Sequence, residues 1–122
     1  MNVLVVEDDP TDLKLMRAIL TAEGHKVAAA RTAEHALQIL ARSLPHIILT
    51  DLALPEMDGI EFTRRLKASP ETVKIPVIAT TAFSDRFPKR EAERAAGFAA
   101  YLVKPIDPLT LPALLIAVCG RT

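Results

Sequence analysis

The chain has 122 residues, 50% of them hydrophobic and 25% charged, so it can bury a core as one domain over residues 1–122. This length leaves no room for a separate output domain. Its 15 basic and 15 acidic residues balance, so no net field attracts nucleic acid or an anionic membrane surface. The single cysteine, Cys119, excludes an intramolecular disulfide. With neither a signal peptide nor a bilayer-length apolar stretch, we expect a soluble cytoplasmic protein.

Short apolar runs alternate with segments of helical period, a pattern typical of a parallel sheet with helices on both faces. Strands are predicted at residues 3–6, 26–30, 46–50, 77–80 and 100–103. Apolar residues at helical spacing predict helices around residues 13–20, 33–40 and 60–66. A fourth helix is expected to start near Pro88, and a fifth to span residues 111–119. Asp9 and Thr32 are expected to cap the first two helices, and Gly59 is expected in a loop.

Polar residues follow four of the five predicted strands. Glu7 and Asp8 come after the first strand, Asp51 after the third, Thr81 after the fourth and Lys104 after the fifth. Because crossovers between parallel strands are right-handed, these strand ends are expected at one edge of the sheet, where open α/β sheets bind ligands. Residues that are far apart in the sequence are therefore expected to form one cluster.

The expected cluster has the chemistry of a metal-assisted phosphoryl acceptor. Carboxylates about 4 Å apart repel by roughly 4 kcal/mol per pair at an effective dielectric constant near 20. A hard divalent cation relieves that repulsion, and oxygen ligands favour Mg²⁺, or Mn²⁺, over Zn²⁺. The metal, Lys104 and the Thr81 hydroxyl would together receive a phosphoryl group. Asp51 is the candidate nucleophile, and the product would be an aspartyl phosphate.

Four segments resemble the receiver domain of two-component response regulators: VVEDD at 5–9, LTDLALPEMDG at 49–59, TTA at 80–82 and YLVKP at 101–105. The resemblance covers the whole chain. It implies an α/β, flavodoxin-like receiver fold, with five parallel strands in the order 2-1-3-4-5 and helices on both faces. It also implies a role for individual residues: Glu7 and Asp8 as the acidic pair, Asp51 as the phosphoacceptor, the Ala53 carbonyl as a metal ligand together with Asp8 and Asp51, Thr81 and Tyr101 as switch residues, and Lys104 as the phosphate-binding lysine.

The resemblance further implies a stand-alone regulator in a phosphorelay. It would accept phosphate from a sensor histidine kinase or a histidine phosphotransfer protein and then change its affinity for a downstream effector protein. Such a protein is a signalling phosphoacceptor and not a turnover enzyme. Two alternatives stay open: a pseudo-receiver adaptor that works without phosphorylation, and a flavodoxin-like cofactor binder. The acidic loop after the first strand disfavours the second, because it repels a cofactor's phosphate.

Apolar positions suggest how the phosphorylated form would behave. Ala53 and Phe83 cannot hydrogen-bond an attacking water, so slow self-dephosphorylation is expected. The predicted last helix carries no charged residue. Two interpretations stay open: one of its faces meets a partner, or it is a short helix with small exposed residues. The candidate partner surface comprises Phe83, Phe87, Leu114, Leu115 and Val118. It is expected to bind an effector, or a second copy through the fourth helix, fifth strand and fifth helix.

Overall fold

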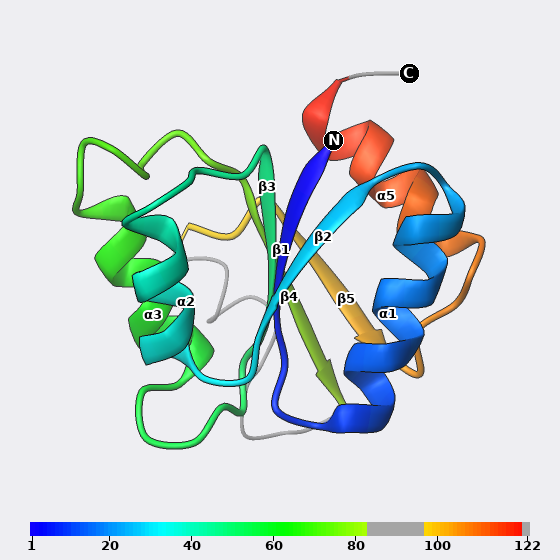
Figure 1. Cartoon of the computed structure of the whole chain (residues 1–122), viewed down its shortest axis with the longest axis horizontal. Coiled ribbons are helices and arrows are strands. Elements are labelled where there is room, and N and C mark those ends of the chain that lie inside the picture. The colour runs from blue at the N-terminus through cyan, green and yellow to red at the C-terminus, as the bar shows by residue number, and fades with distance from the viewer. Residues whose placement is uncertain (83–96, 121–122) are drawn as a thin grey trace.

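The computed structural model describes residues 1–82 and 97–120 of the chain. A five-stranded parallel sheet has the order β2-β1-β3-β4-β5, which confirms the predicted fold class (Figure 1). The strands are β1 (Asn2–Val6), β2 (Lys26–Ala30), β3 (Ile47–Asp51), β4 (Val77–Ala82) and β5 (Ala100–Lys104). The described helices are α1 (Pro10–Ala22), α2 (Ala33–Leu40), α3 (Gly59–Lys67) and α5 (Thr110–Cys119). The predicted helix near Pro88 lies outside the described residues.

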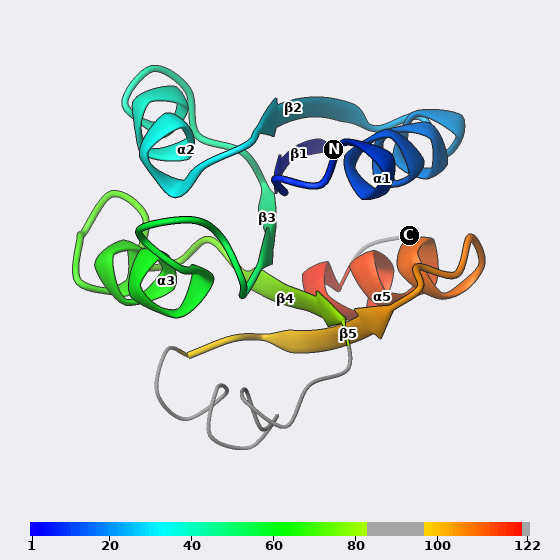
Figure 2. The same ribbon diagram turned by 90° about the horizontal axis from the view of Figure 1, so that it is seen from below.

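The sheet lies between two layers of helices (Figure 2). Helices α2 and α3 cover one face, and α1 and α5 cover the other. Alternate side chains of each strand point to opposite faces. Leu4 and Ile48 pack in the core on the α2 and α3 side, whereas Val5 and Leu49 pack on the α1 and α5 side. Both faces of β1 and β3 are therefore buried, which explains their uninterrupted apolar sequences.

The first two helices begin with the predicted caps. The Asp9 side chain accepts a hydrogen bond from the Thr11 N–H at 3.1 Å, and the Thr32 hydroxyl oxygen accepts one from the His35 N–H at 3.0 Å. Each bond satisfies a backbone donor that has no partner within its own helix. The start of α1, directly after the acidic segment, is thereby fixed.

Three strands end later than their side-chain polarity predicts, and one of them, β5, includes Lys104. Strand β3 begins at Ile47 and includes Asp51, and β4 continues past Thr80 to Ala82. Asp51 pairs with Thr80, and the Leu52 N–H donates to the Thr80 carbonyl oxygen at 3.1 Å. Backbone hydrogen bonds thus continue beyond the last apolar residue, where side-chain polarity gives no indication of them. As a result, Asp51 is held by the sheet and not by a loop.

Gly59 is the first residue of α3, so the prediction of a loop position was wrong. Its N–H donates to the Leu52 carbonyl oxygen at 3.0 Å, which brings the start of the helix against the chain that leaves β3. A Cβ atom at Gly59 would lie 2.1 Å from the Asp51 carbonyl oxygen and 2.9 Å from the Leu52 Cα. Only glycine permits this approach of two main-chain segments.

We expect Gly59→Ala to lower the free energy of unfolding by about 2–3 kcal/mol, because the main chain around Asp51 must move to admit a methyl group. Urea unfolding followed by circular dichroism measures this loss. Gly24→Ala is the matched control, since its positive φ of 87° strains alanine while nothing lies within 4 Å of the added atom. The control should lose only about 1 kcal/mol. Equal losses would contradict a role for the close approach.

Candidate functional site

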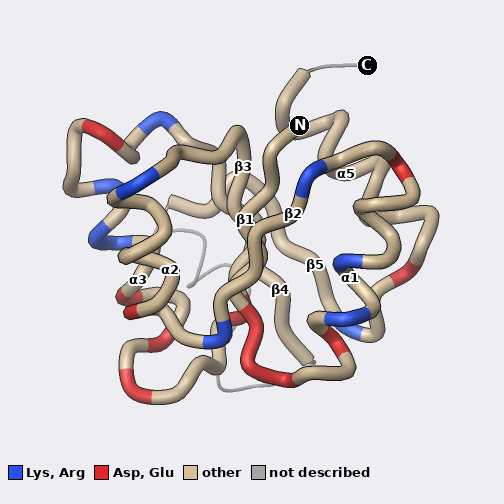
Figure 3. Tube along the Cα trace, in the orientation of Figure 1, with Lys and Arg blue, Asp and Glu red and all other residues tan. Residues whose placement is uncertain are grey.

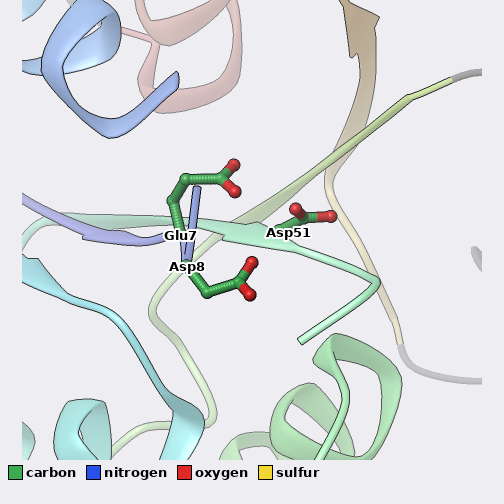
Figure 4. A group of neighbouring side chains, drawn as sticks. All are labelled: Glu7, Asp8 and Asp51. Carbon is green, nitrogen blue, oxygen red and sulfur yellow. The ribbon is translucent and has the colours of Figure 1, made fainter. Parts of the chain in front are cut away.

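Three acidic side chains meet at the edge of the sheet where β1 and β3 end (Figure 4). One carboxylate oxygen from each of Glu7, Asp8 and Asp51 lies within 4.8 Å of the other two. Glu7 is completely buried, Asp51 is 6% exposed and Asp8 is half-buried. Acidic segments of the chain also gather at this edge in Figure 3. The structure therefore brings together the acidic residues that the sequence analysis selected.

Lys104, the last residue of β5, lies among these acids. Its Nζ is 2.7 Å from Glu7 Oε1, 3.0 Å from Asp51 Oδ2 and 3.0 Å from Asp12 Oδ2. The lysine side chain is only 11% exposed. Asp12 is the third residue of α1 and was not among the predicted site residues. The helix dipole stabilises an acid in the first turn of any helix, so an acid at this position does not by itself indicate a site.

The ionisation of the site reflects burial and these contacts. Burial raises the pKa of Glu7 to about 7; the contact with Lys104 opposes this rise, and the charge of Asp51 adds to it. Burial also acts to lower the pKa of Lys104, but its contacts with Glu7, Asp12 and Asp51 outweigh burial and raise the pKa above its ordinary value. The lysine consequently remains a cation, facing more negative charge than it can neutralise.

The donor atoms fit a hard divalent cation. Glu7 Oε2 accepts a hydrogen bond from the Asp9 N–H at 3.1 Å. Glu7 Oε1 is buried and has no aligned hydrogen bond within the described part of the chain, although Lys104 Nζ is close to it. The carboxylates of Glu7, Asp8 and Asp51 crowd more negative charge together than one lysine balances, and a cation beside the three acids would relieve their repulsion. Because the candidate ligands are all oxygens, they suit Mg²⁺ or Mn²⁺ better than Zn²⁺.

Main-chain groups and a second basic residue also orient the acids. The Ala53 N–H donates to Asp51 Oδ1 at 3.0 Å, which leaves Oδ2 toward Lys104. Arg31, directly after β2, donates from its guanidinium to the Asp8 carbonyl oxygen at 3.0 Å. Arg31 was not among the predicted site residues, because a single arginine after a strand carries no distinctive signal. It adds positive charge beside the acidic edge.

The two predicted switch residues lie on neighbouring strands. Thr81, in β4, is 4% exposed, and its hydroxyl donates to the Ala82 carbonyl oxygen at 3.0 Å. Tyr101, in β5, is half-buried and packs against the core on the α2 and α3 side of the sheet. Thr81 follows Thr80, the residue that pairs with Asp51 across the two strands. Phe83, the predicted neighbour of the site, lies outside the described residues.

The candidate partner surface requires a correction. Leu115 is completely buried and packs in the core beneath α5, so its assignment to an exposed surface was wrong. Leu111, one helical turn earlier, is also completely buried, which shows that this stripe of the helix faces the sheet. Leu114 and Val118 are half-buried against the same core. Phe83 and Phe87 lie outside the described part of the chain.

Other apolar side chains are exposed in this region. Val103 of β5 is 46% exposed, Ile116 of α5 is 47% exposed, and Leu109, just before α5, is 83% exposed. Among the described residues, no helix combines the length and the apolar character needed to cross a bilayer.

A parallel sheet of this order, with three acids and one lysine at the carboxyl edge, is the arrangement of a receiver domain. The family model of the response regulator receiver domain matches residues 3–116, and the chain belongs to this family. The polar-differentiation response regulator DivK of Brucella ovis is 39% identical over 106 residues, which cover 87% of this chain and 85% of DivK. Response regulator PleD of Caulobacter vibrioides is 40% identical over 110 residues, but the match spans only 24% of PleD.

Solved structures share the fold over nearly the whole chain. The receiver domain of sensor histidine kinase PA1611 from Pseudomonas aeruginosa PAO1 superposes with a TM-score of 0.88 at 31% identity and 98% coverage of both chains. That crystal structure has a magnesium ion coordinated in the active site cleft. Chemotaxis response regulator CheY4 of Vibrio cholerae superposes with a TM-score of 0.87 at 26% identity, covering 96% of this chain and 97% of CheY4. The predicted family and fold are thus confirmed.

We expect Lys104→Ala to lower the free energy of unfolding by about 2 kcal/mol in EDTA, because it leaves buried carboxylates without their cation. Added Mg²⁺ should then raise the melting temperature more than it does in the unchanged protein, since a more negative site binds the cation more tightly. Differential scanning fluorimetry with EDTA and with Mg²⁺ measures both effects.

Lys67→Ala is the control for this comparison. Lys67 Nζ donates to the Val73 and Ile75 carbonyl oxygens at 3.1 and 2.8 Å, so the variant loses lysine hydrogen bonds away from the acids. Its response to Mg²⁺ should equal that of the unchanged protein. The same Mg²⁺ response in all three proteins would show that Lys104 does not balance the charge of the acidic cluster.

Proposed function

We propose that this chain acts as a single-domain, cytoplasmic response regulator that accepts a phosphoryl group on Asp51. The donor is the phosphohistidine of a sensor histidine kinase or a histidine phosphotransfer protein. The observation that carries the proposal is the position of Lys104 Nζ, 3.0 Å from Asp51 Oδ2, at an edge shared with the carboxylates of Glu7 and Asp8. Membership of the receiver family supports it.

Phosphoryl transfer requires that the charges in the site be balanced. Glu7, Asp8, Asp51 and the Ala53 carbonyl are the groups that would hold Mg²⁺ or Mn²⁺, and the magnesium ion in the PA1611 receiver supports this assignment. When bound, the cation supplies positive charge that neutralises the phosphoryl oxygens.

The transfer itself is a substitution at phosphorus. A carboxylate oxygen of Asp51 forms a bond to phosphorus while the phosphorus–nitrogen bond of the donor breaks, and the electron pair of that bond stays on the imidazole nitrogen. The Lys104 ammonium neutralises charge on a phosphoryl oxygen. The Ala53 N–H, 3.0 Å from Asp51 Oδ1, holds the carboxylate in one orientation. The product is an aspartyl phosphate, so the chain is a signalling phosphoacceptor and not a turnover enzyme.

Phosphorylation is proposed to change two side chains. The Thr81 hydroxyl, which donates to its neighbour's carbonyl oxygen, would turn to a phosphoryl oxygen. Tyr101 would then move inward from its half-buried position. A downstream effector protein that binds the two states with different affinity reads this change.

The effector is proposed to bind at β5 and α5, which expose the apolar side chains of Val103 and Ile116, respectively. An uncharged helix such as α5 favours an apolar contact over an ion-paired one. A second copy of the chain is the alternative occupant of this surface. Sedimentation velocity of the phosphorylated protein distinguishes the two, since a monomer excludes the homodimer.

The central test is phosphorylation by a small donor. Incubation with acetyl phosphate and Mg²⁺ should add the mass of one phosphoryl group, measured by intact-protein mass spectrometry. Asp51→Asn should abolish the gain because it removes the nucleophile, and EDTA should abolish it because the metal is lost. Asp107→Asn is the matched control: Asp107 is exposed and lies before α5, so this variant should label normally. Unlabelled wild type would favour the pseudo-receiver adaptor.

The lifetime of the phosphoryl group is also testable. Ala53 carries an exposed methyl group that cannot orient water, and Phe83 is equally apolar. We expect Ala53→Asn with Phe83→Glu to shorten the phosphoryl half-life about tenfold, because both new side chains can hydrogen-bond an attacking water. The measurement is the decay of the labelled mass after the donor is removed. Ala53→Val, which adds no polar group, should not accelerate the decay. An unchanged half-life in the polar double variant would remove the basis for this expectation.

A further inference from the structure

Asp12 is an acidic contact of Lys104 that the receiver motifs of the sequence do not include. Its Oδ2 lies 3.0 Å from Lys104 Nζ, the same distance as that from Asp51 Oδ2. With Glu7 Oε1 at 2.7 Å, the lysine ammonium has carboxylate oxygens from three residues close to it. The Asp12 side chain is 25% exposed, so the contact is partly shielded from water.

Asp12 differs from the other two neighbours of Lys104 in one respect. Glu7 and Asp51 belong to the group of acids whose oxygens lie within 4.8 Å of one another, and that group does not include Asp12. A cation held by the acids would partly neutralise the negative charge of the Glu7 and Asp51 carboxylates. Phosphorylation converts the Asp51 carboxylate into an acyl phosphate. Both events weaken the hold of these two residues on Lys104, whereas neither alters the Asp12 carboxylate.

The position of Asp12 is well defined by its helix. The first turn of α1 is held by the Asp9 cap, whose side chain accepts from the Thr11 N–H at 3.1 Å. Further along the helix, Met16 and Leu20 are completely buried against the sheet. The Asp12 carboxylate is therefore presented to the end of β5 by a packed element, which is the condition for orienting another side chain.

We propose that Asp12 is a positioning residue for phosphoryl transfer, which keeps the Lys104 ammonium beside the acceptor while Glu7 and Asp51 are engaged by the cation and the phosphoryl group. This inference rests on the proposed function. Without Asp12, the lysine loses the one carboxylate contact that the reaction leaves unchanged, and it spends more time away from the phosphoryl oxygens.

The test uses Asp12→Asn, which keeps the shape of the side chain and removes its charge. At saturating Mg²⁺, phosphorylation of Asp51 by acetyl phosphate should be roughly three- to tenfold slower, as expected for the loss of one charge-assisted contact. In a Lys104→Ala background, the same substitution should cause no further slowing, because its effect passes through the lysine. Glu34→Gln, which removes a charge from the first turn of α2, is the matched control and should label at the normal rate.

A second measurement does not depend on phosphorylation. With Mg²⁺ present, acetylation of the Lys104 amine by an N-hydroxysuccinimide ester, followed by peptide mass spectrometry, should be several-fold faster in Asp12→Asn. An unchanged or faster phosphorylation rate overturns the proposal, as does an equal slowing in the Lys104→Ala background. If the unchanged protein takes no phosphate at all, the proposed function fails, and the acetylation rate alone decides whether Asp12 holds the lysine.

Discussion

The contact between one lysine ammonium and the surrounding carboxylates is the interaction on which the site depends. Lys104 Nζ lies within 3.0 Å of oxygens from Glu7, Asp12 and Asp51. Without it, the buried acids would repel each other by several kcal/mol, at about 4 kcal/mol for each close pair. One positive charge does not neutralise this many carboxylates. The excess of negative charge that makes the lysine necessary therefore also favours binding of a divalent cation. The positive charge of that cation in turn favours binding of a phosphoryl group.

The main chain holds this concentration of charge in a defined geometry. Asp51 and Lys104 are the last residues of β3 and β5, so the hydrogen bonds of the sheet fix their backbones. The start of α3 then approaches the Asp51 main chain so closely that only Gly59 fits there. Regular elements of this kind place catalytic groups more accurately than free loops do. Asp12 extends the arrangement to α1, which lies on the opposite face of the sheet from α3.

The apolar surface of the protein follows from the way α5 packs. Leu111 and Leu115 face the sheet and are completely buried, which leaves Ile116 on the side of the helix that meets solvent. A helix of uniformly apolar residues does not reveal from its sequence which stripe is covered, since every stripe is equally suitable for the core. This explains why Leu115 was wrongly assigned to the partner surface while Ile116 was not selected.

Much of this protein follows from local patterns in the chain. Apolar runs and helical periods predict the alternation of strands and helices, because burial on both faces of a parallel sheet demands them. The receiver motifs point to Asp51 and Lys104 because their chemistry is visible in the residue types. In contrast, Asp12, Arg31 and the role of Gly59 depend on how α1, β2 and α3 approach the edge of the sheet. Such contacts join residues from different elements over a few ångströms, so they arise only when packing sets the distances between those elements.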